Sequence, residues 1–270
     1  MKKKLLLLLT AVLAILCMAG CGSDRNSKSG KSDDKSGSKT YKVGIVQYVD
    51  DASLNQIQKS VQEELDKKGE ELGVKFNYKD YTFNGQADQS TLNQIMTELV
   101  ADGVDLIIPI ATPTALIAQS ATEDNQIPVV FSAVTDPVSA GLVSSMDSPG
   151  ANITGTSDAI DTQAIMKLIL KANSKTKKIG LLYDKSQDSS KQAIADAKKF
   201  CEENNIDVVE KTGTTNDEVA LAADALVAAK VDAVFTPTDN TIMKAELAIY
   251  EKCPHDELTI IMRRYMMRIA

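Results

Sequence analysis

The feature that most constrains the fold is a pattern of short β-rich segments alternating with amphipathic helices, which occurs twice in one chain. The first round begins with KVGIVQYV (42–49), and the second begins with the similar segment KIGLLYD (178–184). Strands that alternate with helices predict a parallel sheet with helices on both of its faces. Two such rounds predict an α/β protein with two similar lobes and a hinge.

The expected elements follow from the period of the apolar residues. In the first round we expect a helix with Ser53 as its N-cap, a helix over 89–102, and strands at 42–49, 73–81, 104–111 and 127–134. The second round repeats this order and closes with VDAVFTPTDN (231–240). The segment between the rounds predicts the crossover and hinge between Thr154 and Asp161.

The first forty residues are not part of either lobe. Three lysines precede an apolar run, which is typical of a secretory signal peptide. The run ends at Met18-Ala19-Gly20-Cys21, which resembles the lipobox of bacterial lipoproteins and implies cleavage before Cys21 and lipidation of its thiol. We therefore expect a signal peptide at 1–20, a flexible polar tether at 21–40, and lobes at 41–157 and 158–252.

The amino-acid composition excludes several classes of function. The chain has a formal net charge of −7 and one histidine, His255. Its scattered basic residues do not predict a nucleic-acid interface, and a single histidine excludes a multi-histidine zinc site. Neither G-x-G-x-x-G after the first strand nor a P-loop is present. We expect no enzyme activity, metal or cofactor. Cys201 lies on an apolar helix stripe, which favours a buried free thiol over a disulfide with Cys253.

The motif Thr-Pro-Thr follows an apolar strand in both rounds, at 112–114 and at 236–238. The carboxyl ends of parallel strands line one edge of a sheet, where ligands bind. Thr is a good N-cap and Pro fits the first helical turn, so each motif predicts a helix N-terminus that favours an anion. The simpler interpretation, that each motif only starts a helix, is weakened because the motif recurs.

Three acidic residues near these motifs have two interpretations each. Asp239 either complements a helix dipole or faces a ligand ammonium group. Asp136, which precedes a proline, fits a turn better than a ligand contact. Asp158, in the crossover, is either a hinge cap or a ligand contact.

Several motifs, taken in order, resemble the tryptophan/tyrosine-type substrate-binding lipoproteins of ABC importers. They are KVGIVQYVDDASL, ATPTA, VVFSAVTDPVSAGLV, NITGTSD and FTPTDNT, within Tyr41 to Lys252. The resemblance implies a type I periplasmic-binding-protein fold, with two Rossmann-like lobes of parallel sheets, on the extracytoplasmic face of the membrane. It also implies an amino-acid ligand, aromatic and either tryptophan or tyrosine, with a permease and its ATPase as partners.

The same resemblance implies which residues line the ligand cleft. Thr112 and Thr114 would hold the ligand carboxylate, Asp239 or Asp158 its ammonium group, and Tyr48 its side chain. The full set is Tyr48, Asp50, Thr112, Thr114, Ser132, Thr135, Asp136, Asp158, Thr238, Asp239 and Asn240. A sugar or nucleoside receptor on the same fold and a sensory lipoprotein without transport are the alternatives, and the absence of tryptophan weighs against a sugar site.

The end of the chain departs from this family pattern. Residues 253–270 hold three of the four arginines, Arg263, Arg264 and Arg268. We expect a frameshifted or truncated tail, an incomplete second lobe and an exposed sheet edge. An amphipathic terminal helix is the alternative.

Overall fold

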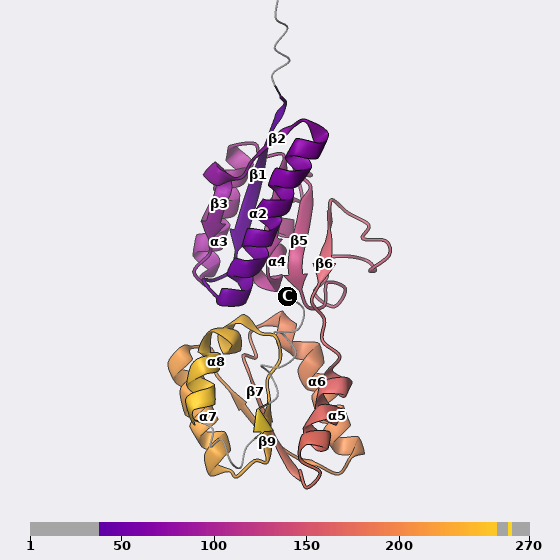
Figure 1. The fold of residues 1–270 in the computed structure, drawn as a ribbon, viewed down its shortest axis with the longest axis vertical. Coiled ribbons are helices and arrows are strands. Elements are labelled where there is room, and N and C mark those ends of the chain that lie inside the picture. The colour runs from indigo at the N-terminus through magenta and orange to yellow at the C-terminus, as the bar shows by residue number, and fades with distance from the viewer. Residues whose placement is uncertain (1–37, 253–258, 261–270) are drawn as a thin grey trace, which may run out of the picture. The chain divides into compact units, whose positions relative to one another are not determined.

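The computed structural model describes residues 38–252 and 259–260, which form two parallel sheets with helices on both faces of each (Figure 1). The first sheet contains β1 (Thr40–Gln47), β2 (Lys75–Asn77), β3 (Thr82–Asn84), β4 (Leu106–Ile110), β5 (Val129–Val134) and β6 (Ile153–Ser157). Its order is β2-β1-β4-β5-β6, with β3 also paired to β1. The predicted α/β fold with two lobes is confirmed.

The second sheet has the order β10-β9-β7-β8. Its strands are β7 (Lys178–Tyr183), β8 (Asp207–Thr212), β9 (Ala233–Phe235) and β10 (Thr259–Ile260). In each sheet the strands that follow the first strand are added on one side of it and then on the other. The change of side falls between β1 and β4 in the first sheet and between β7 and β9 in the second. Ligands of open α/β sheets bind at such points.

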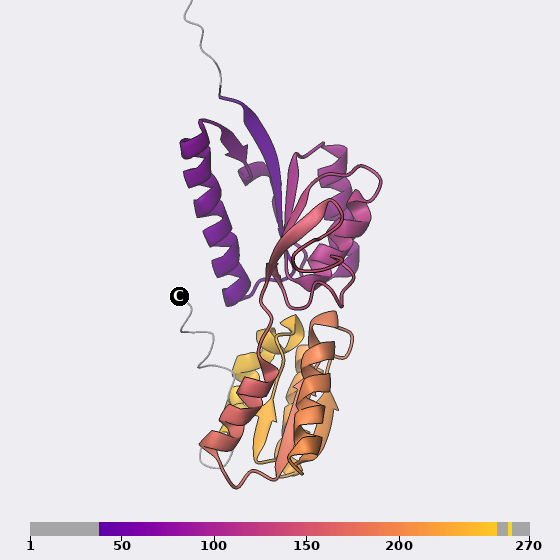
Figure 2. The same cartoon turned by 90° about the vertical axis from the view of Figure 1, so that its right-hand side faces the viewer.

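Among residues 38–252, three α-helices cover the first sheet and four belong to the second lobe. They are α2 (Ala52–Leu72), α3 (Gln89–Ala101) and α4 (Thr112–Thr122), then α5 (Thr162–Ala172), α6 (Asp188–Glu203), α7 (Asn216–Ala228) and α8 (Asn240–Lys252). Figure 2 shows α2 on one side of the first sheet and the magenta helices on the other. No helix in the described ranges is long and apolar enough to cross a membrane.

Each sheet is buried on both faces because consecutive strand residues enter different cores. In β4, Ile107 packs with α3 and α4, whereas Ile108 packs on the α2 side. In β7, Leu181 joins the core beside α5 and α6, and Leu182 joins the core beside α7 and α8. This alternation explains why the strands read as continuous apolar runs.

Two expectations about the first lobe are wrong in detail. The helix cap is Asp51, whose carboxylate accepts hydrogen bonds from the backbone N–H groups of Ser53 and Leu54. The strand expected over 73–81 is broken into β2, a 3-10 turn (Lys79–Tyr81) and β3. The break follows from Tyr78, which is buried and donates its hydroxyl hydrogen bond to Asp66 on α2.

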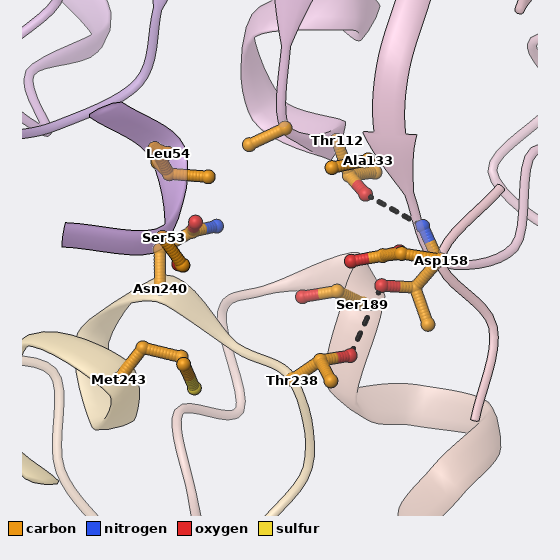
Figure 3. Close-up of a pocket in the computed structure, with 11 residues that line it drawn as sticks. Ser53, Leu54, Thr112, Ala133, Asp158, Ser189, Thr238, Asn240 and Met243 are labelled. Atoms are coloured by element: carbon orange, nitrogen blue, oxygen red, sulfur yellow. Dashed lines mark hydrogen bonds between the residues drawn. The ribbon is translucent and has the colours of Figure 1, made fainter. Parts of the chain in front are cut away.

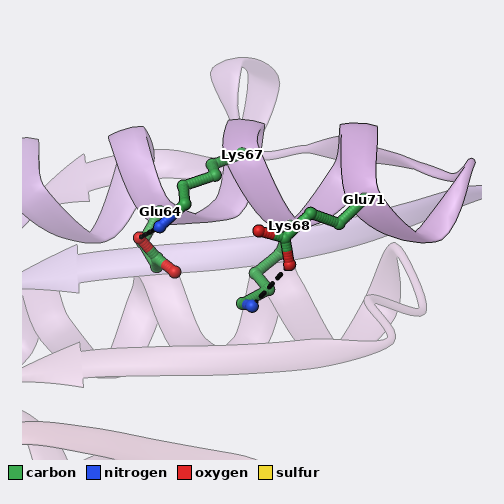
Figure 4. A network of polar contacts seen from close by, with 4 residues as sticks. All are labelled: Glu64, Lys67, Lys68 and Glu71. Atoms are coloured by element: carbon green, nitrogen blue, oxygen red, sulfur yellow. Dashed lines mark hydrogen bonds and ion pairs between the residues drawn. The ribbon is translucent and has the colours of Figure 1, made fainter.

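The exposed face of α2 carries short-range ion pairs (Figure 4). Lys67 approaches Glu64 at 3.4 Å, and Lys68 approaches Glu71 at 2.6 Å. All four side chains are about half exposed or more, so each pair is worth only a few tenths of a kcal/mol. This face is the solvated helix surface that its Lys/Glu pattern predicts.

The lobes are joined through residues 158–161, between β6 and α5. Inside β6, Gly155 passes so close to β5 that an added Cβ would lie 2.1 Å from the carbonyl oxygen of Phe131. Only glycine fits there. Of the atypical tail, the described residues are Thr259 and Ile260, which pair with β9. The other residues of 253–270, Cys253 and His255 included, lie outside the described ranges.

Candidate functional site

A cavity of about 40 Å³ lies between the strand ends of the two lobes (Figure 3). It is lined by Ser53, Leu54, Ala111, Thr112, Ala133, Thr135, Asp158, Ser189, Thr238, Asn240 and Met243. The first seven belong to the first lobe or to the end of its last strand, and the other four to the second. The hydroxyl groups of Thr135 and Thr238, 3.2 Å apart, join the lobes directly.

The first Thr-Pro-Thr motif begins a helix, but Thr112 is not its N-cap. The cap position is Ala111, and no side chain caps the helix. The Thr112 hydroxyl instead accepts a long hydrogen bond, 3.4 Å, from the backbone N–H of Thr135. The uncapped N-terminus of α4 therefore keeps free N–H groups beside the cavity, and these favour an anion.

Ala111 has a backbone conformation that glycine adopts far more readily. Its φ of 81° and ψ of 153° lie in a region that costs alanine about 1–3 kcal/mol. We expect Ala111→Gly to raise the free energy of unfolding by about 1 kcal/mol, after the entropy cost of glycine is subtracted. Urea denaturation checks this result.

The matched control is Ala115→Gly, in the helical part of α4. It is expected to lower the free energy of unfolding by about 1–2 kcal/mol, because it loses helix propensity and the packing of a fully buried methyl group. A loss of stability in Ala111→Gly as large as that in the control contradicts the assignment of strain to position 111.

The second Thr-Pro-Thr motif does not start a helix, contrary to the expectation. β9 ends at Phe235 and α8 begins at Asn240, so Thr236 lies in the connecting segment. Its hydroxyl is buried without a hydrogen-bond partner among the described residues. Asp239 caps α8 by accepting a hydrogen bond from the backbone N–H of Ile242 at 2.7 Å.

Asp239 is fully buried and its oxygens are occupied within the second lobe. One oxygen accepts hydrogen bonds from the backbone N–H of Asp184 and the hydroxyl of Ser190, both at 2.9 Å. Burial raises the pKa of Asp239 to about 6, and these hydrogen bonds offset part of the effect. Asp239 does not line the cavity, so its geometry matches the dipole interpretation better than the ammonium one.

Asp158 is the only carboxylate among the residues that line the cavity. It follows the end of β6, and although part of the residue is exposed, the surrounding protein atoms desolvate its carboxyl and raise its pKa. Interaction with the Thr135 side chain offsets part of that rise. A carboxylate with no cationic partner among the described residues is suited to a ligand cation.

The structure brings together five of the predicted site residues and leaves six outside the cavity lining. Thr112, Thr135, Asp158, Thr238 and Asn240 line it, whereas Tyr48, Asp50, Thr114, Ser132, Asp136 and Asp239 do not. Asp50 accepts a hydrogen bond from Asn55, and Asp136 accepts one from the backbone N–H of Ser139, as a turn residue does. Thr114 is buried, and its hydroxyl has no hydrogen-bond partner in the part of the chain that the structure describes.

Two of the remaining residues border the cavity walls without lining them. Tyr48 packs against both cores of the first lobe, and burial, followed by the charge of Asp184, raises its pKa. The carbonyl oxygen of Ser132 accepts a hydrogen bond from the backbone N–H of Ala111 at 3.0 Å. The Ser132 carbonyl therefore holds the backbone from which α4 begins.

Sequence reasoning missed the apolar and small residues of the lining. Leu54 and Met243 fit the apolar stripes of α2 and α8, so nothing in their spacing distinguishes them from core residues. Ser189 lies in the first turn of α6, within the segment 184–190 that the sequence placed at the cleft without choosing a residue. The Ser189 hydroxyl is buried and has no hydrogen-bond partner within residues 38–252.

Known proteins resemble this chain over most of its length. Residues 42–261 match the family described as ABC transporter substrate binding protein. The tyrosine-binding protein of Clostridioides difficile is 36% identical over 263 residues, which are 96% of this chain and 74% of that protein.

Two solved structures are similar at nearly equal identity. An ABC domain from Streptococcus pneumoniae in complex with L-Trp has a TM-score of 0.74 at 34% identity, covering 82% of this chain and 73% of that one. The ligand-free, open structure of a substrate-binding protein with adhesive properties from Clostridium difficile has a TM-score of 0.57 at 32% identity, with the same coverage of both chains.

Proposed function

Because this chain belongs to the ABC transporter substrate-binding protein family, we propose that it binds an aromatic amino acid, tryptophan or tyrosine, between its two lobes. The chain is homologous to tyrosine- and tryptophan-binding proteins. Its family and fold are those of solute receptors rather than enzymes, and the family is extracytoplasmic.

The observation that carries the proposal is a pair of opposite electrostatic features on one cavity. The uncapped N-terminus of α4 favours a carboxylate, and the negative charge of Asp158 favours an ammonium group. A free amino acid carries both charges on neighbouring atoms. Leu54 and Met243 lie on the other side of the cavity from Thr112 and Asp158 (Figure 3), where an apolar side chain would pack.

The cavity is too small to admit such a ligand without movement of the lobes. Its 40 Å³ is room for a few water molecules, whereas pockets for small ligands are about 300–1,000 Å³. The higher TM-score with the L-Trp complex than with the open structure supports a closed arrangement of the lobes here. We propose that the lobes open about residues 158–161 to admit the ligand and close on it.

Ligand binding should stabilise the folded protein. The purified full chain in detergent is expected to gain about 2.7 kcal/mol of unfolding free energy with tryptophan or tyrosine at 100 times Kd. Glycine and glutamate serve as controls that lack an aromatic ring. A melting temperature that no proteinogenic amino acid changes would contradict the proposal.

We further propose that the protein is attached to the membrane by a lipid on Cys21 and delivers its ligand to a permease and its ATPase. The proposal is supported by the sequence around Cys21, which resembles a lipobox, and by the family to which the chain belongs. Radiolabelled palmitate is expected to label the wild-type protein in bacterial cells but not Cys21→Ala. Equal labelling of both proteins would contradict lipidation at this residue.

A further inference from the structure

A chain of hydrogen bonds in the second lobe runs from a buried carboxylate to the cavity. Asp184 is 2% exposed, and one of its oxygens accepts hydrogen bonds from the backbone N–H and hydroxyl of Ser186 at 2.8 and 2.6 Å. Its other oxygen accepts one from the hydroxyl of Thr241 at 2.7 Å. The Thr241 proton is therefore directed at Asp184.

The direction of this hydrogen bond fixes the orientation of the Gln187 side-chain amide. Because the Thr241 hydroxyl donates to Asp184, its oxygen is left to accept, and it does so from Gln187 Nε2 at 3.0 Å. Gln187 is 5% exposed, and its Oε1 atom then faces Asn240. It accepts hydrogen bonds from both the backbone N–H and Nδ2 of Asn240, at 3.2 and 3.0 Å.

The chain ends at Asn240, which lines the cavity. Its Nδ2 atom is engaged by Gln187, so the atom left over is the carbonyl oxygen Oδ1. No described residue donates a hydrogen bond to Oδ1. Turning the Asn240 amide over would place two acceptor oxygens against each other and leave a donor unpaired, which is unfavourable in a buried setting.

We propose that Asn240 is a specificity residue whose Oδ1 accepts a hydrogen bond from the ligand side chain, and that Gln187 is the residue that positions it. Figure 3 shows Asn240 on the same side of the cavity as Leu54 and Met243, away from Asp158. That is the side on which the proposed function places the aromatic ring, and the inference rests on that function. The ligand class is an aromatic amino acid with a donor on its ring, a phenol or an indole.

Two pairs of ligands that differ by one hydrogen-bond donor test the inference on the full chain by calorimetry. L-tyrosine and L-phenylalanine differ by the phenol hydroxyl, and L-tryptophan and 1-methyl-L-tryptophan differ at the indole N–H. The wild-type protein is expected to prefer the donor-bearing member of at least one pair by about tenfold. Equal affinity within both pairs overturns the inference.

Two variants identify the residues responsible. Asn240→Leu removes the acceptor and should bring the preference close to one. Gln187→Leu removes the acceptor that holds Asn240 Nδ2 and should lower the preference. A general loss of stability does not change the ratio of the affinities for the two ligands of a pair. Asn93→Leu, on the exposed surface of α3, is the matched control.

The outcomes separate the inference from the function on which it rests. A preference that survives in Asn240→Leu overturns the role of Asn240, and one that survives in Gln187→Leu overturns the role of Gln187. If Asn240→Leu does not fold, the affinities of the wild-type protein for the two ligand pairs still test the inference. A wild-type protein that binds none of the four ligands overturns the proposed function as well.

Discussion

Replacing Asp158 by asparagine is expected to weaken amino-acid binding by about 2–3 kcal/mol, or roughly 30- to 150-fold in Kd. The reason is that Asp158 is the only carboxylate lining the cavity, so no other cavity residue replaces its negative charge beside the ligand ammonium group. Asparagine has nearly the same shape and keeps one acceptor oxygen, so packing is preserved. Calorimetric titration with tryptophan and tyrosine measures the loss.

A pair of ligands shows whether the loss concerns the ammonium group. The wild-type protein should prefer L-tryptophan to indole-3-propionate, which lacks that group, and the preference should largely vanish in Asp158→Asn. Asp124→Asn, on an exposed residue just after α4, is the matched control and should bind as the wild-type protein does. If Asp158→Asn retains the full preference for the amino acid, the ammonium contact lies elsewhere.

The second large effect is a dependence of stability on pH that originates at Asp239. Burial raises its pKa from 3.8 to about 6 in the folded protein. Between these values the folded state binds more protons than the unfolded state, so the contribution is fully present below about pH 4 and is lost as the pH rises through about 6. The shift corresponds to about 3 kcal/mol, because the carboxylate must ionise in a buried site beside Asp184.

Urea denaturation at several pH values between 4 and 7 tests this expectation. The difference in unfolding free energy between the wild-type protein and Asp239→Asn should change by about 2–3 kcal/mol across that range, because only the wild-type protein titrates at position 239. Other carboxylates titrate in both proteins and their effects cancel. Parallel curves would show that residue 239 has the same pKa in the folded and unfolded states.

Much of the fold was predictable because apolar residues recur at a different spacing in strands than in helices. The strands at β1, β4, β5 and β7 and the stripe on α3 follow directly from that pattern. The break in the strand expected over 73–81 was not predictable, because the turn after Asn77 depends on the burial of Tyr78 against α2. That contact joins residues distant in sequence, and no local pattern reveals it.

The candidate site was predictable in position but only partly in its members. The strand ends indicated where a ligand would lie, and Thr112, Thr135 and Asp158 were among the residues expected there. The functional difference between Asp158 and Asp239 was not apparent, since both are acidic residues near a helix or a hinge. It depends on three donors from residues 184, 190 and 242, which occupy the Asp239 oxygens in the folded chain.

The contacts of Asp239 also determine what holds the wall of the cavity in place. They bind the start of α8 to the end of β7 and to α6, and the bond from Thr241 to Asp184 adds a second attachment. Every one of these partners precedes residue 243. The cavity residues Thr238, Asn240 and Met243 are therefore held by bonds whose partners all precede Met243, and a substitution beyond Lys252 removes none of these bonds.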